Sequence, residues 1–144
     1  MHQDRTAGSE TLEALARRAR ASAYAPYSGF RVGAALEDAA GRRYVGCNVE
    51  NASYPVTLCA ERAAIGAAIA AGARSFTRLH LCSDSEGPIA PCGMCRQALA
   101  ELAPDLVVVS EGTGGERRSW TVAELLPERF ALLPDLPLRP SEDG

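Results

Sequence analysis

The sequence of 144 residues contains no lysine: all 15 of its basic residues are arginine, set against 18 acidic residues. A chain without lysine cannot form a Schiff base with pyridoxal phosphate or a carbonyl substrate, and it lacks the lysine of a phosphate-binding P-loop or a protein kinase. Histidine is nearly as scarce, because His2 and His80 are the only two. Chemistry in this chain therefore has to come mainly from cysteine and carboxylate side chains.

The sequence also lacks the features that are typical of nucleic-acid-binding and membrane-bound proteins. The net charge is −3 and the arginines are scattered, so the sequence carries no basic footprint for nucleic acid. The Ala-rich stretch 60–73 is shorter than the roughly 20 apolar residues that span a membrane, and it contains Glu61 and Arg62. The polar N-terminus lacks the apolar core of a secretory signal. We expect a cytoplasmic protein with neither a nucleic-acid partner nor a membrane partner.

The length predicts one domain over residues 9–133, preceded by a flexible segment 1–8 and followed by a disordered tail 134–144. Hydrophobic periodicity and Gly or Pro breaks predict elements along the whole domain. The expected helices cover 9–23, 58–71, 91–102 and 123–126, and the expected strands cover 30–37, 43–49, 76–82, 106–109 and 119–122. Alternating strands and helices predict an α/β fold in which helices cover a mixed sheet.

Five cysteines in a chain without an export signal argue against a disulfide framework and for metal or redox chemistry. Cys92 and Cys95 form a C-x-x-C pair at the start of an expected helix, where both sulfur atoms can reach one point. Cys59 also begins an expected helix, and Glu61 follows two residues later. Three thiolates suit zinc and leave its fourth position open to water, which is typical of a catalytic site, and Glu61 would be the general base there.

Two other interpretations of the cysteines remain. A structural zinc site needs a fourth protein ligand, for which Cys47, Cys82 and His80 are candidates. A thioredoxin-like dithiol would leave Cys59 and Glu61 without a purpose. We expect Cys47 and Cys82 to be buried thiols and His80 to be a core residue.

The spacing Cys59-Ala60-Glu61 followed by Pro91-Cys92-Gly93-Met94-Cys95 matches the zinc deaminase pattern of ligand-x-Glu and Pro-Cys-x-x-Cys. Together with the segments Tyr24–Ala35 and Cys47–Tyr54, it resembles the homotetrameric zinc-dependent cytidine deaminases over nearly the whole chain from Leu12 to Phe130. The resemblance implies a three-layer α/β/α sandwich around a roughly five-stranded mixed sheet. It also implies a cytoplasmic homotetramer that acts in pyrimidine salvage and deaminates cytidine and deoxycytidine.

The resemblance further implies roles for individual residues. Cys59, Cys92 and Cys95 would hold one Zn²⁺ per subunit, and Glu61 would move the protons. Substrate-binding positions would be Phe30 against the pyrimidine, Asn48 and Glu50 at the ribose hydroxyls, Ala60, and the aromatic residues Tyr54 and Phe130, which would reach a neighbouring subunit's site.

One electrostatic difficulty accompanies this assignment, because three thiolates around a dication leave a net charge of −1. We expect Arg62 and the two helix N-termini to compensate, with Arg62 hydrogen-bonded to a ligating sulfur. Two alternatives remain open: a non-catalytic zinc-stabilised interaction module, and a relative that acts on another aminopyrimidine such as blasticidin S. A polynucleotide deaminase is disfavoured by the missing basic groove.

Overall fold

The computed structural model describes residues 10–133, so the segments expected at 1–8 and 134–144, as well as His2, lie outside the described residues. In the described part a five-stranded sheet has the order β2-β1-β3-β4-β5. The strands are β1 (Val32–Asp38), β2 (Arg43–Cys47), β3 (Phe76–Ser83), β4 (Val107–Glu111) and β5 (Arg117–Thr121). The sheet is mixed, because β3 and β4 run parallel while β1–β2, β1–β3 and β4–β5 are antiparallel pairs.

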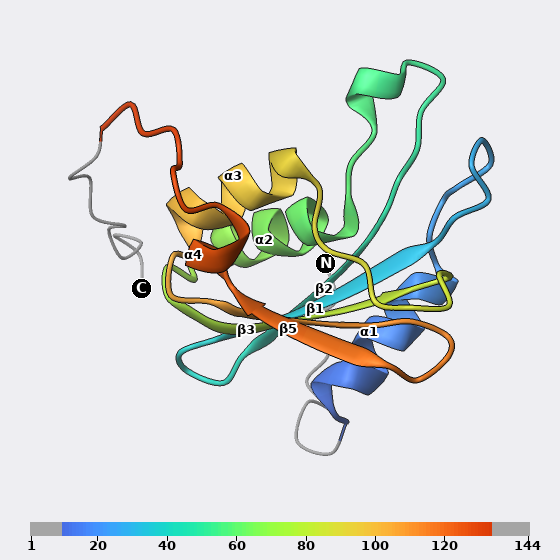
Figure 1. Cartoon of the computed structure of the whole chain (residues 1–144), viewed down its shortest axis with the longest axis horizontal. Coiled ribbons are helices and arrows are strands. Elements are labelled where there is room, and N and C mark those ends of the chain that lie inside the picture. Colours follow the sequence, from blue (N-terminus) through green and yellow to red (C-terminus); the bar gives the residue numbers. More distant parts are fainter. Residues whose placement is uncertain (1–9, 134–144) are drawn as a thin grey trace.

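Helices cover both faces of this sheet, as Figure 1 shows. The helices are α1 (Leu12–Ala21), α2 (Ala60–Ala70), α3 (Gly93–Leu102) and the single turn α4 (Val122–Leu125), with a short 3₁₀ turn η1 (Tyr54–Val56) before α2. No helix in the described part is long and apolar enough to cross a membrane.

The alternation of side chains along the strands explains the layers. Ala35 of β1 and Cys82 of β3 pack in one small cluster with the apolar stripe of α1. Ala34 and Leu81, their neighbours along the same strands, face the opposite way and join the main core with α2 and α3. This arrangement confirms the α/β fold with a mixed five-stranded sheet between helices.

The start of α2 lies directly on β2 because Gly46 has no side chain. A Cβ atom at Gly46 would stand 2.5 Å from the Ala60 carbonyl oxygen and 2.5 Å from the Ala64 amide nitrogen. Glycine therefore permits backbone contact between strand and helix at the point where the first turn of α2 begins. That turn carries two of the candidate site residues, Cys59 and Glu61.

Several predicted boundaries need correction. Thr11 caps α1, so the helix begins at Leu12 rather than at residue 9, and it ends at Ala21. β2 ends at Cys47 because Val49 leaves the sheet and pairs instead with Tyr24 and Leu58. β5 begins two residues earlier than expected, at Arg117, which pairs with Glu111 of β4. It ends where Thr121 and Glu124 form a capping box for α4.

Candidate metal and catalytic site

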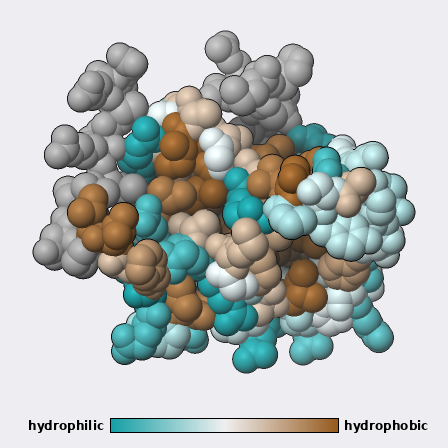
Figure 2. Space-filling view, turned by 90° about the horizontal axis from the view of Figure 1, so that it is seen from above, coloured by the Kyte–Doolittle hydropathy of each residue, from teal (hydrophilic) through white to brown (hydrophobic). Residues whose placement is uncertain are grey.

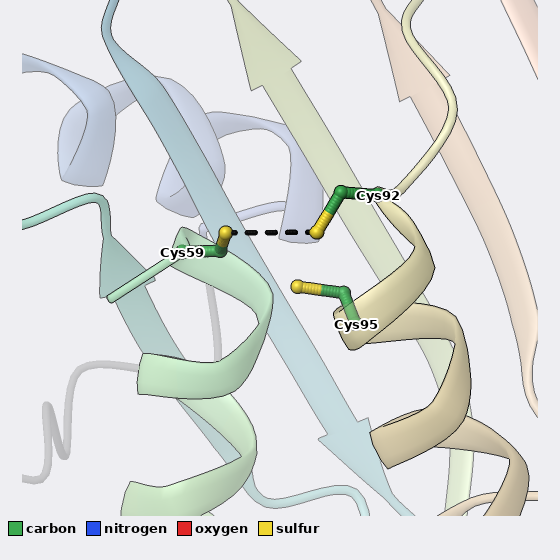
Figure 3. Close-up of side chains that lie close together, drawn as sticks. All are labelled: Cys59, Cys92 and Cys95. Carbon is green, nitrogen blue, oxygen red and sulfur yellow. Dashed lines mark hydrogen bonds between the residues drawn. The ribbon is translucent and has the colours of Figure 1, made fainter. Parts of the chain in front are cut away.

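The N-termini of α2 and α3 lie side by side and bring three thiols together. Cys59 is the N-cap residue of α2, and Cys92 is the N-cap residue of α3. Neither cysteine uses its side chain to cap its own helix. Cys95 lies in the first turn of α3, and Figure 3 shows all three sulfur atoms pointing into the space between the helices. The three sulfur atoms lie within 4.8 Å of one another.

The geometry of the thiols fits a tetrahedral metal. The Sγ atoms of Cys59 and Cys92 are 3.8 Å apart, which is far too long for a disulfide bond of about 2.0 Å. Two ligands at about 2.3 Å from a tetrahedral zinc ion would be about 3.8 Å apart. The donor set, three sulfur atoms at this spacing, is therefore one that zinc prefers, and Cys59, Cys92 and Cys95 are the residues that would hold it.

The candidates for a fourth protein ligand lie elsewhere. His80 and Cys82 belong to β3, and Cys82 packs against α1, on the sheet face opposite to α2 and α3. Cys47 alternates with Gly46, which faces α2, so its side chain also lies on the α1 side. Among residues 10–133 the only three-residue metal-binding group is Cys59, Cys92 and Cys95. A structural site with four protein ligands is therefore absent from the described chain.

Arg62 lies beside the thiols. Its Nη2 is 3.5 Å from the Sγ of Cys59 and donates a hydrogen bond of 3.1 Å to the Thr57 carbonyl. Without metal, the hydrogen bond from Cys95, followed by those from Arg62 and Cys92, lowers the pKa of Cys59 to about 5. The same Cys59 thiolate, together with burial, raises the pKa of Cys95. The guanidinium of Arg62 thus places a positive charge beside the cysteine thiols.

Glu61 lies in the first turn of α2, immediately next to this cluster, and is 6% exposed. Burial raises its pKa, and the negative charge of Cys59 raises it further, against the lowering effect of its own backbone amide and Cys95. A carboxyl group with a raised pKa can both accept and return a proton near neutral pH. The structure therefore places a buried, ionisable carboxyl group beside the three thiols.

A second group of residues forms around the turn 24–30. The side chain of Asn48 accepts a hydrogen bond from the Val32 amide at 2.8 Å and donates one to the Phe30 carbonyl at 2.8 Å. The carboxylate of Glu50 accepts hydrogen bonds from the amides of Tyr27 and Ser28. Phe30, Asn48 and Glu50 are thus brought together by the same turn.

The other sequence-predicted residues lie as follows. Tyr54 is 71% exposed, and its ring contacts Tyr27 edge to face with centroids 6.0 Å apart. Phe130 is also 71% exposed, and its carbonyl accepts a hydrogen bond from the side chain of Gln97. The methyl group of Ala60 is fully buried in the main core, so any contact with a substrate would have to come from its backbone.

Sequence reasoning missed two residues that support the site. Ser28 bonds the Glu50 carboxylate through its hydroxyl. Arg96 donates to the Pro91 carbonyl at 2.7 Å and to the Leu125 carbonyl at 3.0 Å, and so fixes the segment before Cys92 to the end of α4. The serine in a Pro-Tyr-Ser-Gly turn was a usable signal for the first, whereas the contacts of Arg96 depend on the fold.

Comparisons with known proteins agree with this geometry. The family model described as the cytidine and deoxycytidylate deaminase zinc-binding region matches residues 7–111. A cytidine deaminase from Sporosarcina psychrophila is 46% identical over 123 residues, which are 85% of this chain and 90% of that protein. The crystal structure of a cytidine deaminase from Burkholderia pseudomallei is 48% identical with a TM-score of 0.80, and the match covers 83% of this chain and 96% of that chain.

A further relative is a blasticidin-S deaminase from Bacillus cereus, which is 35% identical over 107 residues, 69% of this chain and 76% of that protein. The fold and the thiol cluster define a zinc-binding α/β protein. The extent of the matches then decides the family: the chain belongs to the cytidine and deoxycytidylate deaminases.

Proposed function

We propose that this protein hydrolyses cytidine and 2′-deoxycytidine to uridine and 2′-deoxyuridine, with release of ammonia. The observation that carries the proposal is the buried carboxyl group of Glu61 beside three thiols that could hold one metal and would leave its fourth position open. A structural metal site has no need of an ionisable acid at this point. The names of the relatives, cytidine deaminases at 46% and 48% identity, support the same substrate.

Glu61 would move protons twice in this reaction. Zinc, when bound, acts as a Lewis acid and lowers the pKa of water enough for it to lose a proton near neutral pH. Glu61 accepts that proton and delivers it to N3 of the pyrimidine as the water oxygen adds to C4. Glu61 then takes the second proton of the added hydroxyl and gives it to the 4-amino group, which leaves as ammonia while C4 becomes a carbonyl. One water is consumed, and N3 keeps its proton in uridine.

Other residues would position the substrate. Phe30 would lie against the pyrimidine ring, while Asn48 and Glu50 would bind the ribose hydroxyls, with a backbone contribution from Ala60. Their common turn holds them together, and the pairing of Val49 with Leu58 ties this group to the residue before Cys59. Arg62 would offset the charge of the thiolates, because its guanidinium stands next to Cys59.

The proposal includes a homotetramer in the cytoplasm. Tyr54 and Phe130 are large aromatic side chains that one chain leaves exposed, and Figure 2 shows further apolar residues on the face seen from above. Exposed apolar patches mark interaction sites, and a neighbouring subunit's site would cover these two rings. Free thiols at all five cysteines suit a reducing compartment. Light scattering should give about four times the chain mass of 15.2 kDa; a monomer would contradict the assembly.

The activity is tested with Glu61→Gln and a matched helical control, Glu101→Gln, whose side chain is exposed on α3. Metal analysis should find one zinc per chain in wild type and in both variants. Wild type and Glu101→Gln should convert cytidine to uridine at the same rate, as measured by the change in ultraviolet absorbance. Glu61→Gln should keep its zinc and its melting temperature but lose at least about 10²-fold in kcat. Zinc-loaded wild type without activity on any aminopyrimidine would instead favour an interaction module.

A second candidate substrate is blasticidin S, because one relative carries that activity in its name. Cytidine ranks first since the cytidine deaminase relatives are more similar to this chain. Comparing kcat/KM for cytidine and blasticidin S with the same zinc-loaded protein would decide between them.

A further inference from the structure

The turn 24–30 is joined by backbone hydrogen bonds to the segment that leads into the metal site. The amide of Gly29, whose φ is +68°, donates to the Ala25 carbonyl and closes the turn. The Tyr24 amide donates to the Asn48 carbonyl at 3.0 Å, and the Glu50 amide donates to the Tyr24 carbonyl at 2.8 Å. Figure 1 shows the two loops projecting from the same end of the sheet.

The hydroxyl of Ser28 stands at the centre of this turn and makes two bonds. It donates to Oε2 of Glu50 at 2.5 Å and accepts from the amide of Phe30 at 3.0 Å. It therefore links the carboxylate expected at the ribose to the backbone of the residue expected at the pyrimidine. No other side-chain hydroxyl in residues 10–133 donates to the Glu50 carboxylate.

The Glu50 carboxylate is close to saturated by this turn. Its Oε1 accepts from the amides of Tyr27 at 2.9 Å and Ser28 at 3.1 Å, in addition to the hydroxyl bond at Oε2. An ionised carboxylate offers about four acceptor positions, so about one is left for a ligand. These bonds, the one from the Ser28 hydroxyl first, lower the pKa of Glu50 and keep it ionised. A carboxylate held in one orientation binds a hydroxyl without losing further side-chain entropy.

We propose that Ser28 is a positioning residue that holds the Glu50 carboxylate in place and thereby gives the site its preference for substrates that carry ribose hydroxyls. This inference rests on the proposed function. If Ser28 acts through Glu50 at the sugar, removing its hydroxyl must weaken binding of nucleosides with sugar hydroxyls. It must leave nucleosides without those hydroxyls nearly unaffected.

The test compares Ser28→Ala, Ser28→Thr and Glu50→Ala in the zinc-loaded protein. With cytidine, Ser28→Ala should raise KM about tenfold, as expected for a hydrogen bond to a charged group, and should lower kcat much less. With 2′,3′-dideoxycytidine, Ser28→Ala should match wild type. Ser28→Thr, which keeps the hydroxyl, should restore most of the affinity for cytidine. The double variant Ser28→Ala/Glu50→Ala should bind cytidine no worse than Glu50→Ala alone, because both changes remove one interaction.

Ser119→Ala is the matched control, since Ser119 is exposed on β5 and remote from the turn; its KM should equal that of wild type. Equal losses of Ser28→Ala on cytidine and on 2′,3′-dideoxycytidine would overturn the proposal, because they would mean a general distortion of the turn. The proposal would also be overturned if the double variant lost as much affinity for cytidine as the two single variants lose in sum.

Binding of the product provides a readout that does not need turnover. Calorimetric titration should show that Ser28→Ala weakens the binding of uridine about tenfold and leaves the binding of 2′,3′-dideoxyuridine unchanged. A wild-type protein that binds uridine but does not convert cytidine would contradict the proposed function, while the titration would still judge the role of Ser28. A zinc-loaded wild type that fails to bind uridine would overturn both.

Discussion

Replacing Gly46 by alanine should damage the site without touching any residue in it. The added Cβ atom would lie 2.5 Å from both the Ala60 carbonyl oxygen and the Ala64 amide nitrogen, whereas ordinary contact begins at 3.4 Å. The first turn of α2 must therefore move away from β2 by the difference, about 0.9 Å. Both neighbouring atoms belong to backbone, so no side-chain rotation can relieve the contact.

Two magnitudes follow. Overpacking of this kind lowers the free energy of unfolding by about 1–3 kcal/mol. The moving turn carries Cys59 and Glu61, and a misplacement near 1 Å can lower the rate of catalysis by about 10². Gly46→Ala should therefore lose activity even under conditions where it is fully folded. The assay combines urea denaturation, zinc analysis and kcat/KM for cytidine.

Gly66→Ala is the matched control. Gly66 lies on the exposed side of α2, where an added Cβ meets nothing within 4 Å. Alanine there should raise the free energy of unfolding by about 0.5–1 kcal/mol through the better helix propensity and should leave kcat/KM unchanged. A Gly46→Ala protein as stable and as active as wild type would refute the reasoning about contact between β2 and α2.

The remaining predictions concern charge. Arg62→Gln removes the positive charge beside the Sγ of Cys59, so the zinc site becomes more negative and groups there lose protons less readily; the acidic limb of the pH–rate profile should move to higher pH, and retention of both zinc and an unchanged profile would contradict this role. His80 is fully buried, and burial lowers its pKa against the opposing effect of Glu111 and Glu13. As the pH falls, this histidine is therefore protonated in the unfolded chain before it is protonated in the folded protein. The free energy of unfolding is then highest above the ordinary histidine pKa near 6.5 and decreases as the pH drops below it. Urea denaturation between pH 7.5 and 5 should show this decrease in wild type, and the decrease should be smaller in His80→Leu; equal slopes in the two proteins would count against it.

Much of the fold could be predicted because local patterns and the tertiary structure agree. Hydrophobic periodicity together with Gly and Pro breaks located every strand and every major helix, and the family resemblance supplied the layers. Boundaries failed where a distant partner decides them. Val49 leaves β2 because Tyr24 and Leu58 offer backbone bonds, and Arg117 joins β5 because Glu111 lies opposite.

The site shows the same division. The proximity of the three thiols and Glu61 could be predicted, because their spacing and helix starts are local properties of the sequence. The bond between Ser28 and Glu50 spans 22 residues, and the contact of Gly46 with α2 requires the helix to be docked. Neither leaves a periodic signal, since both depend on how one loop or helix packs on another.

The placement of the thiols on two separate helices also has a consequence for the chain as a polymer. Cys59 and Cys92 are 33 residues apart, and the segment between them contains all of α2 and β3. A metal ion that joins them closes this loop as a cross-link would. For a loop of that length, the chain-entropy relation for disulfides gives a restriction of the unfolded chain of about 4 kcal/mol. The ion that would activate water would then also act as a reversible cross-link that stabilises the fold. Unlike a disulfide, this cross-link would be removed by a chelator and not by a reductant.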